Sequence, residues 1–199
     1  RYARVVWNGD EILEVQPPLQ KFGKSHILPP PGAFLQATLE GEAALVAAVR
    51  EICQESKRVL DLFAGCGTFS LPLAEQAEVH AVEGEGEMLA ALDTGWRQAL
   101  GLKRITTQTR DLFRRPILLD EFKGFDAAVI DSPRAGAKAQ VQELATSGIK
   151  KIAFVSCNPA TFVRDAEILI SGGYSLDWVQ VIDQFRWSAH SELVAQFSL

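Results

Sequence analysis

Residues 61–68 read DLFAGCGT, a glycine-rich turn that continues an apolar run starting at Val59. The run Val59–Phe63 is typical of a buried strand, and a helix is predicted over 70–76. Glycines at 65 and 67 let the backbone turn tightly and let a ligand come close to the main chain. The N-terminus of the helix points into the same space and favours negative charge there. This segment therefore predicts a ligand-binding turn between a strand and a helix.

On both sides of this turn, strand patterns alternate with helix patterns. Strands are predicted at 59–63, 79–82, 105–109, 125–131, 152–156, 174–185 and 193–198, and helices at 40–53, 70–76, 85–100, 138–147 and 160–171. Such alternation predicts an α/β fold: a mainly parallel, seven-stranded, Rossmann-like sheet with helices on both faces. Sheets of this kind bind ligands outside the carboxyl ends of their strands, so the chemistry is expected there.

The first 38 residues follow a different pattern. Asn8-Gly9-Asp10 separates two short apolar runs, which predicts a β-hairpin, and prolines at 29–31 mark a linker. We expect a partial β-rich segment over 1–38 and an α/β domain over 39–199. The sequence starts without methionine, so we expect the first segment to be the remnant of a longer region.

Composition excludes several classes of protein. The chain has 199 residues, of which 47% are hydrophobic and 23% charged, as in ordinary globular proteins. No uncharged run reaches the roughly 18 residues that span a bilayer, so no membrane association is predicted. The net charge of −5 argues against binding of nucleic acid by bulk electrostatics, and any RNA must meet a local patch. No protein partner is predicted.

Cysteine usage points to a reducing compartment. The three cysteines, Cys53, Cys66 and Cys157, form no C-x-x-C pair. We therefore expect no iron–sulfur cluster and no metal site in this segment, and we expect a cytoplasmic protein.

Acidic residues at strand ends indicate a nucleoside-bearing cofactor. Glu83 ends the second strand, where a carboxylate accepts hydrogen bonds from both ribose hydroxyls. The third glycine of the dinucleotide fingerprint is missing, and Phe69 and Ser70 leave less room for a pyrophosphate. This favours S-adenosylmethionine over NAD. Asp111 follows the third strand and either reaches the adenine amino group or caps a helix.

The fourth and fifth strands end in residues suited to chemistry. Asp131-Ser132-Pro133-Arg134 is either a site loop, in which Arg134 binds a phosphate or carbonyl, or a surface loop with a capping Asp. Cys157 lies at a strand exit beside a predicted helix N-terminus, a position that lowers a thiol pKa. It is either a nucleophile or a small buried hydrophobic residue. Glu192 precedes the last strand and is either functional or solvated.

Four motifs in order resemble the RNA uracil-C5 methyltransferases, which make 5-methyluridine in transfer or ribosomal RNA. They are DLFAGCGTFSLPLA at 61–74, DSPRAG at 131–136, SCNPATFVRD at 156–165, and His190-Ser191-Glu192. The resemblance runs from Phe34 to the C-terminus. It departs from the family pattern at Thr38, Ser132 and Ser191. The family's N-terminal RNA-binding barrel and its common iron–sulfur cysteines are absent from this sequence.

The resemblance implies a role for each matching position. Cys157 matches the nucleophile that adds to C6 of uracil, and Glu192 matches the base that removes the C5 proton. Positions expected to bind S-adenosylmethionine are Gln36, Phe63, Gly65, Thr68, Glu83, Asp111 and Asp131, with Arg134 expected to bind the RNA.

Other functions remain open at this point. A methyltransferase acting on amino groups would carry an aromatic residue where Arg134 stands, and an RNA cytosine-C5 enzyme would add a second cysteine in 131–134. A small-molecule methyltransferase needs no nucleophilic cysteine. A non-catalytic RNA-binding or scaffold protein with a relict cofactor pocket is disfavoured by the intact Cys157, Glu192 and Asp131.

Overall fold

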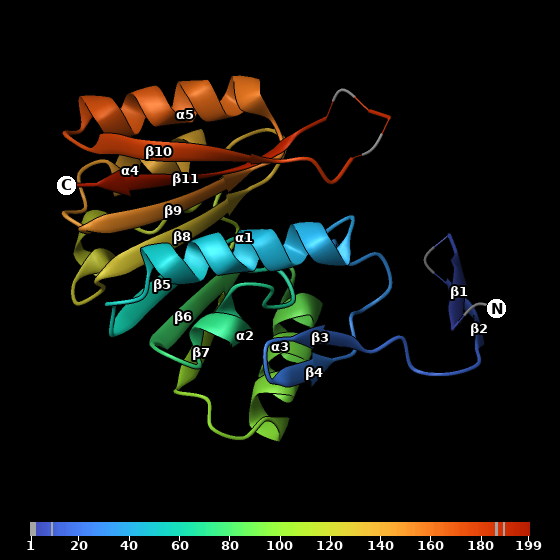
Figure 1. Ribbon diagram of the computed structural model, residues 1–199. Coiled ribbons are helices and arrows are strands. Elements are labelled where there is room, and N and C mark those ends of the chain that lie inside the picture. Colours follow the sequence, from blue (N-terminus) through green and yellow to red (C-terminus); the bar gives the residue numbers. More distant parts are fainter. Residues whose placement is uncertain (1–2, 9, 186, 189) are drawn as a thin grey trace.

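The fold is built on one seven-stranded sheet (Figure 1). The computed structural model describes residues 3–8, 10–185, 187–188 and 190–199. The sheet order is β10-β11-β9-β8-β5-β6-β7, in which β5 to β9 run parallel and β11 is antiparallel to both β9 and β10. The strands are β5 (Arg58–Leu62), β6 (Glu78–Glu83), β7 (Ile105–Thr109), β8 (Ala127–Ser132), β9 (Lys151–Ser156), β10 (Ser175–Ile182) and β11 (Glu192–Ser198). The predicted mainly parallel seven-stranded sheet is confirmed.

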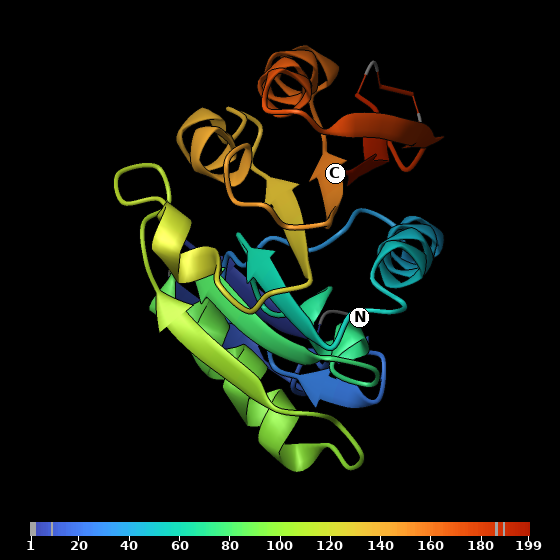
Figure 2. The same ribbon diagram turned by 90° about the vertical axis from the view of Figure 1, so that its left-hand side faces the viewer.

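Helices cover both faces of the sheet, because alternate residues of each buried strand point to opposite sides. Val59 and Val129 pack under α1 (Leu39–Ile52), α2 (Ser70–Leu73) and α3 (Gly86–Gln98). Leu60 and Ile130 pack under α4 (Lys138–Leu144) and α5 (Pro159–Ser171), beside a short 3-10 helix, η1 (Leu119–Phe122). Figure 2 shows α1 on one side of the twisted sheet and α4 and α5 on the other.

Several element boundaries differ from the sequence prediction, and the helix expected over 138–147 ends at Leu144. The helix expected over 70–76 ends at Leu73, and turn hydrogen bonds such as Gln76 N–H to Leu73 O follow it. The strand expected over 174–185 ends at Ile182, where it pairs with Glu192. The described residues between these two paired positions form the hairpin loop, so they leave the sheet and lie near the strand ends.

The N-terminal segment contains two hairpins. The predicted one is present as β1 (Arg4–Trp7) and β2 (Asp10–Glu14), although Gly9 at its turn lies outside the described residues. It stands apart from the sheet (Figure 1). A second hairpin, β3 (Gln20–Phe22) and β4 (Ser25–Ile27), was not predicted. It packs on α3, and its buried Phe22 and Ile27 join the core beneath α1 and α3. The domain boundary at residue 38 stays a prediction.

Among the described residues, none of the helices combines the length and the apolar character that crossing a bilayer requires.

Candidate active site

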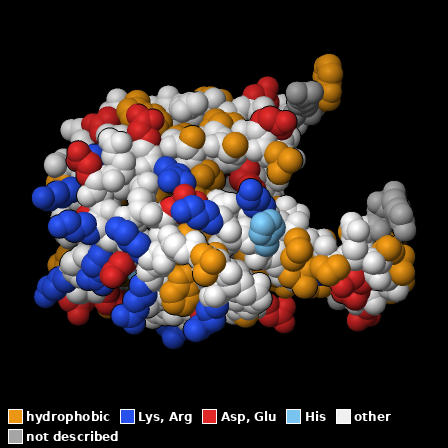
Figure 3. Space-filling model, turned by 60° about the horizontal axis from the view of Figure 1, so that its bottom comes forward, with side chains coloured by type: hydrophobic (Ala, Val, Ile, Leu, Met, Phe, Trp, Pro, Cys, Tyr) orange, Lys and Arg blue, Asp and Glu red, His pale blue; other side chains and the backbone are white. Residues whose placement is uncertain are grey.

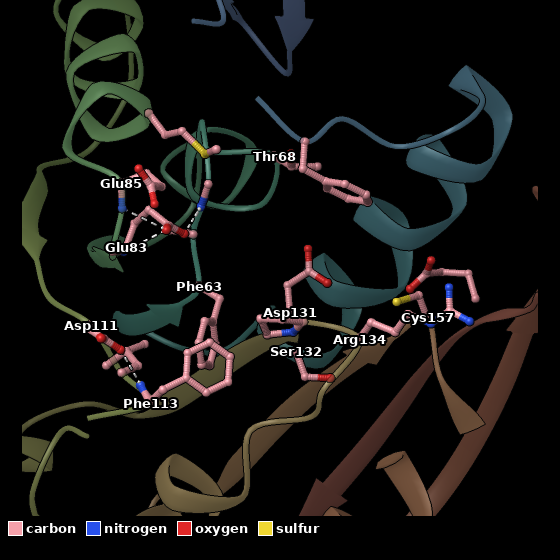
Figure 4. A pocket seen from close by; sticks show the side chains of 18 of the residues that line it. Phe63, Thr68, Glu83, Glu85, Asp111, Phe113, Asp131, Ser132, Arg134 and Cys157 are labelled. Carbon is pink, nitrogen blue, oxygen red and sulfur yellow. Dashed lines mark hydrogen bonds between the residues drawn. The ribbon is translucent and has the colours of Figure 1, made fainter. Parts of the chain in front are cut away.

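A cavity of about 770 Å³ opens at the carboxyl ends of the parallel strands (Figure 4). It is the place where open α/β sheets bind ligands. Nine of the ten residues predicted from the sequence line it: Phe63, Gly65, Thr68, Glu83, Asp111, Asp131, Arg134, Cys157 and Glu192. Residues 80 or more positions apart therefore share one site because their strands end together.

The glycine-rich turn is held by Glu83. One carboxylate oxygen accepts from Gly65 N–H at 3.0 Å, and the other accepts from Gly84 N–H at 2.7 Å and Glu85 N–H at 3.1 Å (Figure 4). Gly65 has φ +55°, and a Cβ there would meet no atom within 4 Å, so the backbone faces open space. Phe63 also has a positive φ, +61°, which directs its ring along the cavity wall. The turn thus presents bare backbone to a ligand.

The wall beside this turn is aromatic and acidic. The rings of Phe63 and Phe113 lie 5.5 Å apart between centroids at 57°. The Asp111 carboxylate accepts from Phe113 N–H at 3.0 Å and Arg114 N–H at 3.3 Å, so it caps a turn while lining the cavity. The predicted capping role of Asp111 is thus seen over a turn rather than a helix, and its contact with an adenine amino group stays a prediction. Phe113 and Met88 also line the cavity, although no sequence pattern pointed to either residue.

Cys157 and Glu192 meet at the opposite end of the cavity from Phe63 and Asp111. β9 and β11 pair so that Ser156 lies opposite Leu193, and the same antiparallel register brings the next residues, Cys157 and Glu192, together. Asp131 enters from β8, where it pairs with Val155. In Figure 4, Asp131 and Ser132 lie between the Glu83–Asp111 side and Cys157. One end of the cavity therefore suits a nucleoside, and the other end carries the thiol of Cys157.

Carboxyl groups dominate the electrostatics of the thiol end. Burial raises the pKa of Glu192 to about 7, although a hydrogen bond from Gln184 opposes the shift. The pKa of Asp131 is raised well above its ordinary value by burial and by the carboxylates of Glu192, Asp61 and Glu83. Such clusters of shifted groups are typical of functional sites.

The thiol of Cys157 departs from the sequence prediction. Its pKa is raised, first by burial and then by the negative charges of Glu192 and Asp131, while its backbone environment and Arg134 act in the lowering direction. The predicted lowering of its pKa by the helix N-terminus is therefore wrong for the free protein. Burial of the thiol is the largest cause, because it disfavours the charged form, and the carboxyl groups of Glu192 and Asp131 act in the same direction.

Arg134 is exposed at the cavity rim, in a loop held by α5. Asn158 caps α5 through Ala160 N–H, as predicted, and its amide also donates to Arg134 O at 3.0 Å. Buried Asp165 accepts from Ala137 N–H at 2.8 Å and pairs with Arg164 at 2.7 Å. The conspicuous Arg-Asp of the SCNPATFVRD motif thus fixes the loop that carries Arg134.

Gln36 is the one predicted residue that is not among the described lining residues. Its side-chain oxygen accepts from Gln184 at 2.7 Å, and Gln184 also donates to Glu192 at 3.1 Å. Gln184 escaped the sequence reading because a single glutamine in a loop carries no recognisable pattern. The cofactor contact of Gln36 stays a prediction.

The cavity suits S-adenosylmethionine in shape and charge. Glu83 and Asp111 offer acceptors beside the rings of Phe63 and Phe113, as a nucleoside requires. Three carboxyl groups, from Glu83, Asp131 and Glu192, line the path to Cys157, which suits a cationic sulfonium. In the described part of the chain, no group of three or more His, Cys, Asp or Glu side chains is arranged to hold a metal ion.

Comparisons with known sequences agree on one family. A family model described as tRNA (uracil-5-)-methyltransferase matches residues 97–196. An uncharacterized RNA methyltransferase of Rhizobium meliloti is 52% identical over 193 residues, covering 97% of this chain and 46% of that protein. The 23S rRNA (uracil(1939)-C(5))-methyltransferase RlmD of Pseudomonas fluorescens is 40% identical over 181 residues, covering 86% of this chain and 39% of that protein. The chain spans less than half the length of these relatives.

Solved structures similar to this chain include a methyltransferase that acts on uracil C5. The tRNA (uracil-54, C5)-methyltransferase of Pyrococcus abyssi, solved with S-adenosyl-L-homocysteine, superposes with a TM-score of 0.81 and is 26% identical, over 99% of this chain and 48% of that one. The M. jannaschii protein TYW2, solved with AdoMet, has a TM-score of 0.63 at 18% identity, which shows the shared fold alone.

Proposed function

Because the chain belongs to the tRNA (uracil-5-)-methyltransferase family, we propose that it methylates C5 of a uridine in tRNA or rRNA through a covalent Cys157 adduct. The observation that carries this proposal is that Cys157 and Glu192, each next to the last β9–β11 pair, line one end of a cavity whose other end suits a nucleoside. Since the chain spans less than half of its relatives' length, the activity and the RNA partner belong to the proposal.

The residues at the thiol end divide the reaction between them. Uracil C5 is a poor nucleophile, and the Cys157 thiolate activates it by forming a bond to C6. C5 then takes the methyl group, which S-adenosylmethionine supplies on a positively charged sulfur. Glu192, in its carboxylate form, removes the C5 proton, and the electron pair of that bond expels the Cys157 thiolate. The uracil ring is restored, now methylated at C5.

Arg134 is proposed to hold RNA at the rim of the cavity. It is exposed, it lines the entrance, and its positive charge lies near enough to Cys157 to act on the thiol pKa. A uridine must leave its helix to reach such a recessed thiol. In Figure 3 most of the visible Lys and Arg side chains gather on the left, at the end away from the β1–β2 hairpin, although the chain has a net charge of −5. RNA binding at Arg134 is therefore proposed from the position of this residue at the cavity and not from the overall charge.

We propose the cytoplasm as the compartment, on the ground of the free thiols at Cys53, Cys66 and Cys157.

The proposal is tested with RNA that contains 5-fluorouridine, mixed with the protein and S-adenosylmethionine and analysed by intact mass. Fluorine at C5 cannot leave as a proton, so the reaction should stop as a protein–RNA adduct. Cys157→Ala should form no adduct, whereas Cys53→Ala, which changes a buried thiol in the core outside the cavity, should form it fully.

Two results would contradict the proposal. An adduct that survives in Cys157→Ala would assign the nucleophile elsewhere. Binding of S-adenosylhomocysteine with no adduct and no methylated uridine would favour a relict pocket or a different substrate.

A further inference from the structure

We propose that Gln184 is a positioning residue, which holds the carboxylate of Glu192 in the orientation needed to take the C5 proton. The inference rests on the proposed function of Glu192 and goes beyond it, since neither the family motifs nor the sequence patterns single out Gln184. The residue lies in the loop between β10 and β11, eight positions before Glu192. A loop glutamine would ordinarily point to water, yet this one is only 3% exposed.

The amide nitrogen of Gln184 makes two hydrogen bonds inside the protein, while its buried Oε1 has no partner among the described residues. Its Nε2 donates one proton to Gln36 Oε1 at 2.7 Å and the other to Glu192 Oε2 at 3.1 Å. Both donors of the amide are therefore used, and both partners are acceptors. The bond to Glu192 involves a buried carboxylate, and such charge-assisted bonds fix geometry more strongly than neutral ones.

The backbone of α1 packs closely against the side chain of Gln184. Gly41, in the first turn of α1, faces Gln184, and a Cβ there would lie 2.5 Å from Gln184 Oε1 and 2.8 Å from Gln184 Cβ. Thr38 caps the same helix through Gly41 N–H at 3.0 Å. The start of α1, the linker at Gln36 and the β10–β11 loop therefore converge on one side chain. Through this side chain, Glu192 is linked to the linker at Gln36 and to the start of α1.

The amide also controls when Glu192 is a base. The titratable groups near Glu192 are Cys157, which follows β9, Asp131 from β8 and His190 from its own loop. Burial is what raises the pKa of Glu192. Gln184 supplies a hydrogen bond that lowers the pKa of Glu192 against the effect of burial. Its loss should leave Glu192 protonated, and therefore inactive as a base, up to a higher pH.

The test compares Gln184→Met with wild type on RNA labelled with tritium at uridine C5. Methionine keeps the length of the side chain and removes both hydrogen bonds. Tritium release should fall about 10-fold or more, the effect of losing a bond to a charged group. The covalent RNA adduct should accumulate, and the acidic limb of the pH–rate profile should move upward. Affinity for S-adenosylhomocysteine should be unchanged, which shows that the cavity is intact.

Gln196→Met is the matched control. Gln196 lies on β11, as Glu192 does, and donates a hydrogen bond of 2.8 Å to the carboxylate of Asp177. Neither Gln196 nor Asp177 lines the cavity. Gln196→Met should behave as wild type. Gln184→Glu, which places a second carboxyl against Glu192, should slow tritium release further than Gln184→Met. Equal release rates and equal pH profiles in Gln184→Met and Gln196→Met would overturn the inference.

A second measurement is independent of activity. Carboxyl-carbon NMR titration of Glu192, assigned with Glu192→Gln, should show a higher pKa in Gln184→Met than in wild type. An unchanged pKa would overturn the role of Gln184 even if wild type forms no RNA adduct. Conversely, a raised pKa in a protein that never forms the adduct would refute the proposed function alone.

Discussion

At the scale of single residues, the site is defined by charges that oppose its own nucleophile. Cys157 lies at a helix N-terminus, but burial and then the charges of Glu192 and Asp131 raise its thiol pKa. A thiol kept protonated until ligands arrive is protected from oxidation and alkylation, since the thiolate is the reactive form. The same carboxylates suit a cavity that binds a cationic sulfonium. The site thus favours reaction when it is filled over reaction when it is empty.

Glu192→Gln should make Cys157 more reactive in the free protein. Removing the carboxylate removes a charge that disfavours the thiolate, so alkylation by iodoacetamide at pH 8 should accelerate about 3- to 10-fold. Because the pKa of Glu192 is about 7, its charge is present above that pH and lost below it. The difference from wild type should therefore grow as pH rises through about 7. Mass spectrometry of alkylated Cys157 measures the rate.

Glu85→Gln is the control for that measurement. Glu85 lines the same cavity, but it is not among the charges that act on Cys157. Equal acceleration in both variants would mean that the net charge of the cavity, and not the neighbouring Glu192, sets the reactivity of the thiol.

At the scale of elements, the motif at 156–165 gives α5 two structural roles. Its N-terminus follows Cys157, and its second turn holds the loop that carries Arg134. Asp165 is fully buried and bonds Ala137 N–H, while Arg164 bonds both Asp165 and Ala135 O. Gly136, which lies between Ala135 and Ala137, has φ +77°, and a Cβ there would collide with Arg164 and Asp165. The loop and the helix therefore form one rigid unit.

Asp165→Ala should destabilise the protein by about 2–3 kcal/mol, because it leaves a buried N–H without its acceptor and Arg164 without its partner. Urea denaturation measures the change in the free energy of unfolding. Asp93→Ala is the control, since Asp93 pairs with Arg97 at 2.7 Å on the exposed side of α3. It should cost less than about 0.5 kcal/mol. Equal losses in the two variants would argue against a buried clamp.

At the scale of the whole molecule, the N-terminal segment is divided between the sheet domain and a separate arm. β3 and β4 pack on α3, where Gly95 lets Ile27 and His26 O approach the helix. β1 and β2 stand apart and expose Trp7, Ile12 and Leu13. The side chain of Arg4 on β1 donates a hydrogen bond to Pro29 O at 2.9 Å, which links this hairpin to the linker. The β3–β4 hairpin thus packs as part of the sheet domain.

Gly95→Ala should weaken the docking of the β3–β4 hairpin. A Cβ at this position would collide with Ile27 and lie 3.1 Å from His26 O. We expect a loss of about 1–2 kcal/mol, since overpacking outweighs the gain in helix propensity. Hydrogen exchange should become faster in residues 20–27. Gly86→Ala, in the same helix with its nearest neighbour atom at 3.6 Å, should be neutral or slightly stabilising. Unchanged exchange in Gly95→Ala would show that the hairpin is held by other contacts.

The sequence by itself determined the parts of this protein that local patterns encode. Strand and helix alternation predicted the sheet, and the turn at 61–68 and the motifs at 131–136 and 156–165 contain residues that line the cavity. These signals are local because each depends on the residues of one strand, one turn or one helix. Nine of ten predicted site residues line the cavity for that reason.

Only the tertiary structure decided what surrounds those residues. The raised pKa of Cys157 depends on carboxylates brought from β8 and β11 by strand register. The link from Gln36 to Gln184 joins residues 148 positions apart, and the docking of β3–β4 on α3 depends on one glycine. Electrostatic and packing energies depend on distance in space, and a sequence window does not contain those distances.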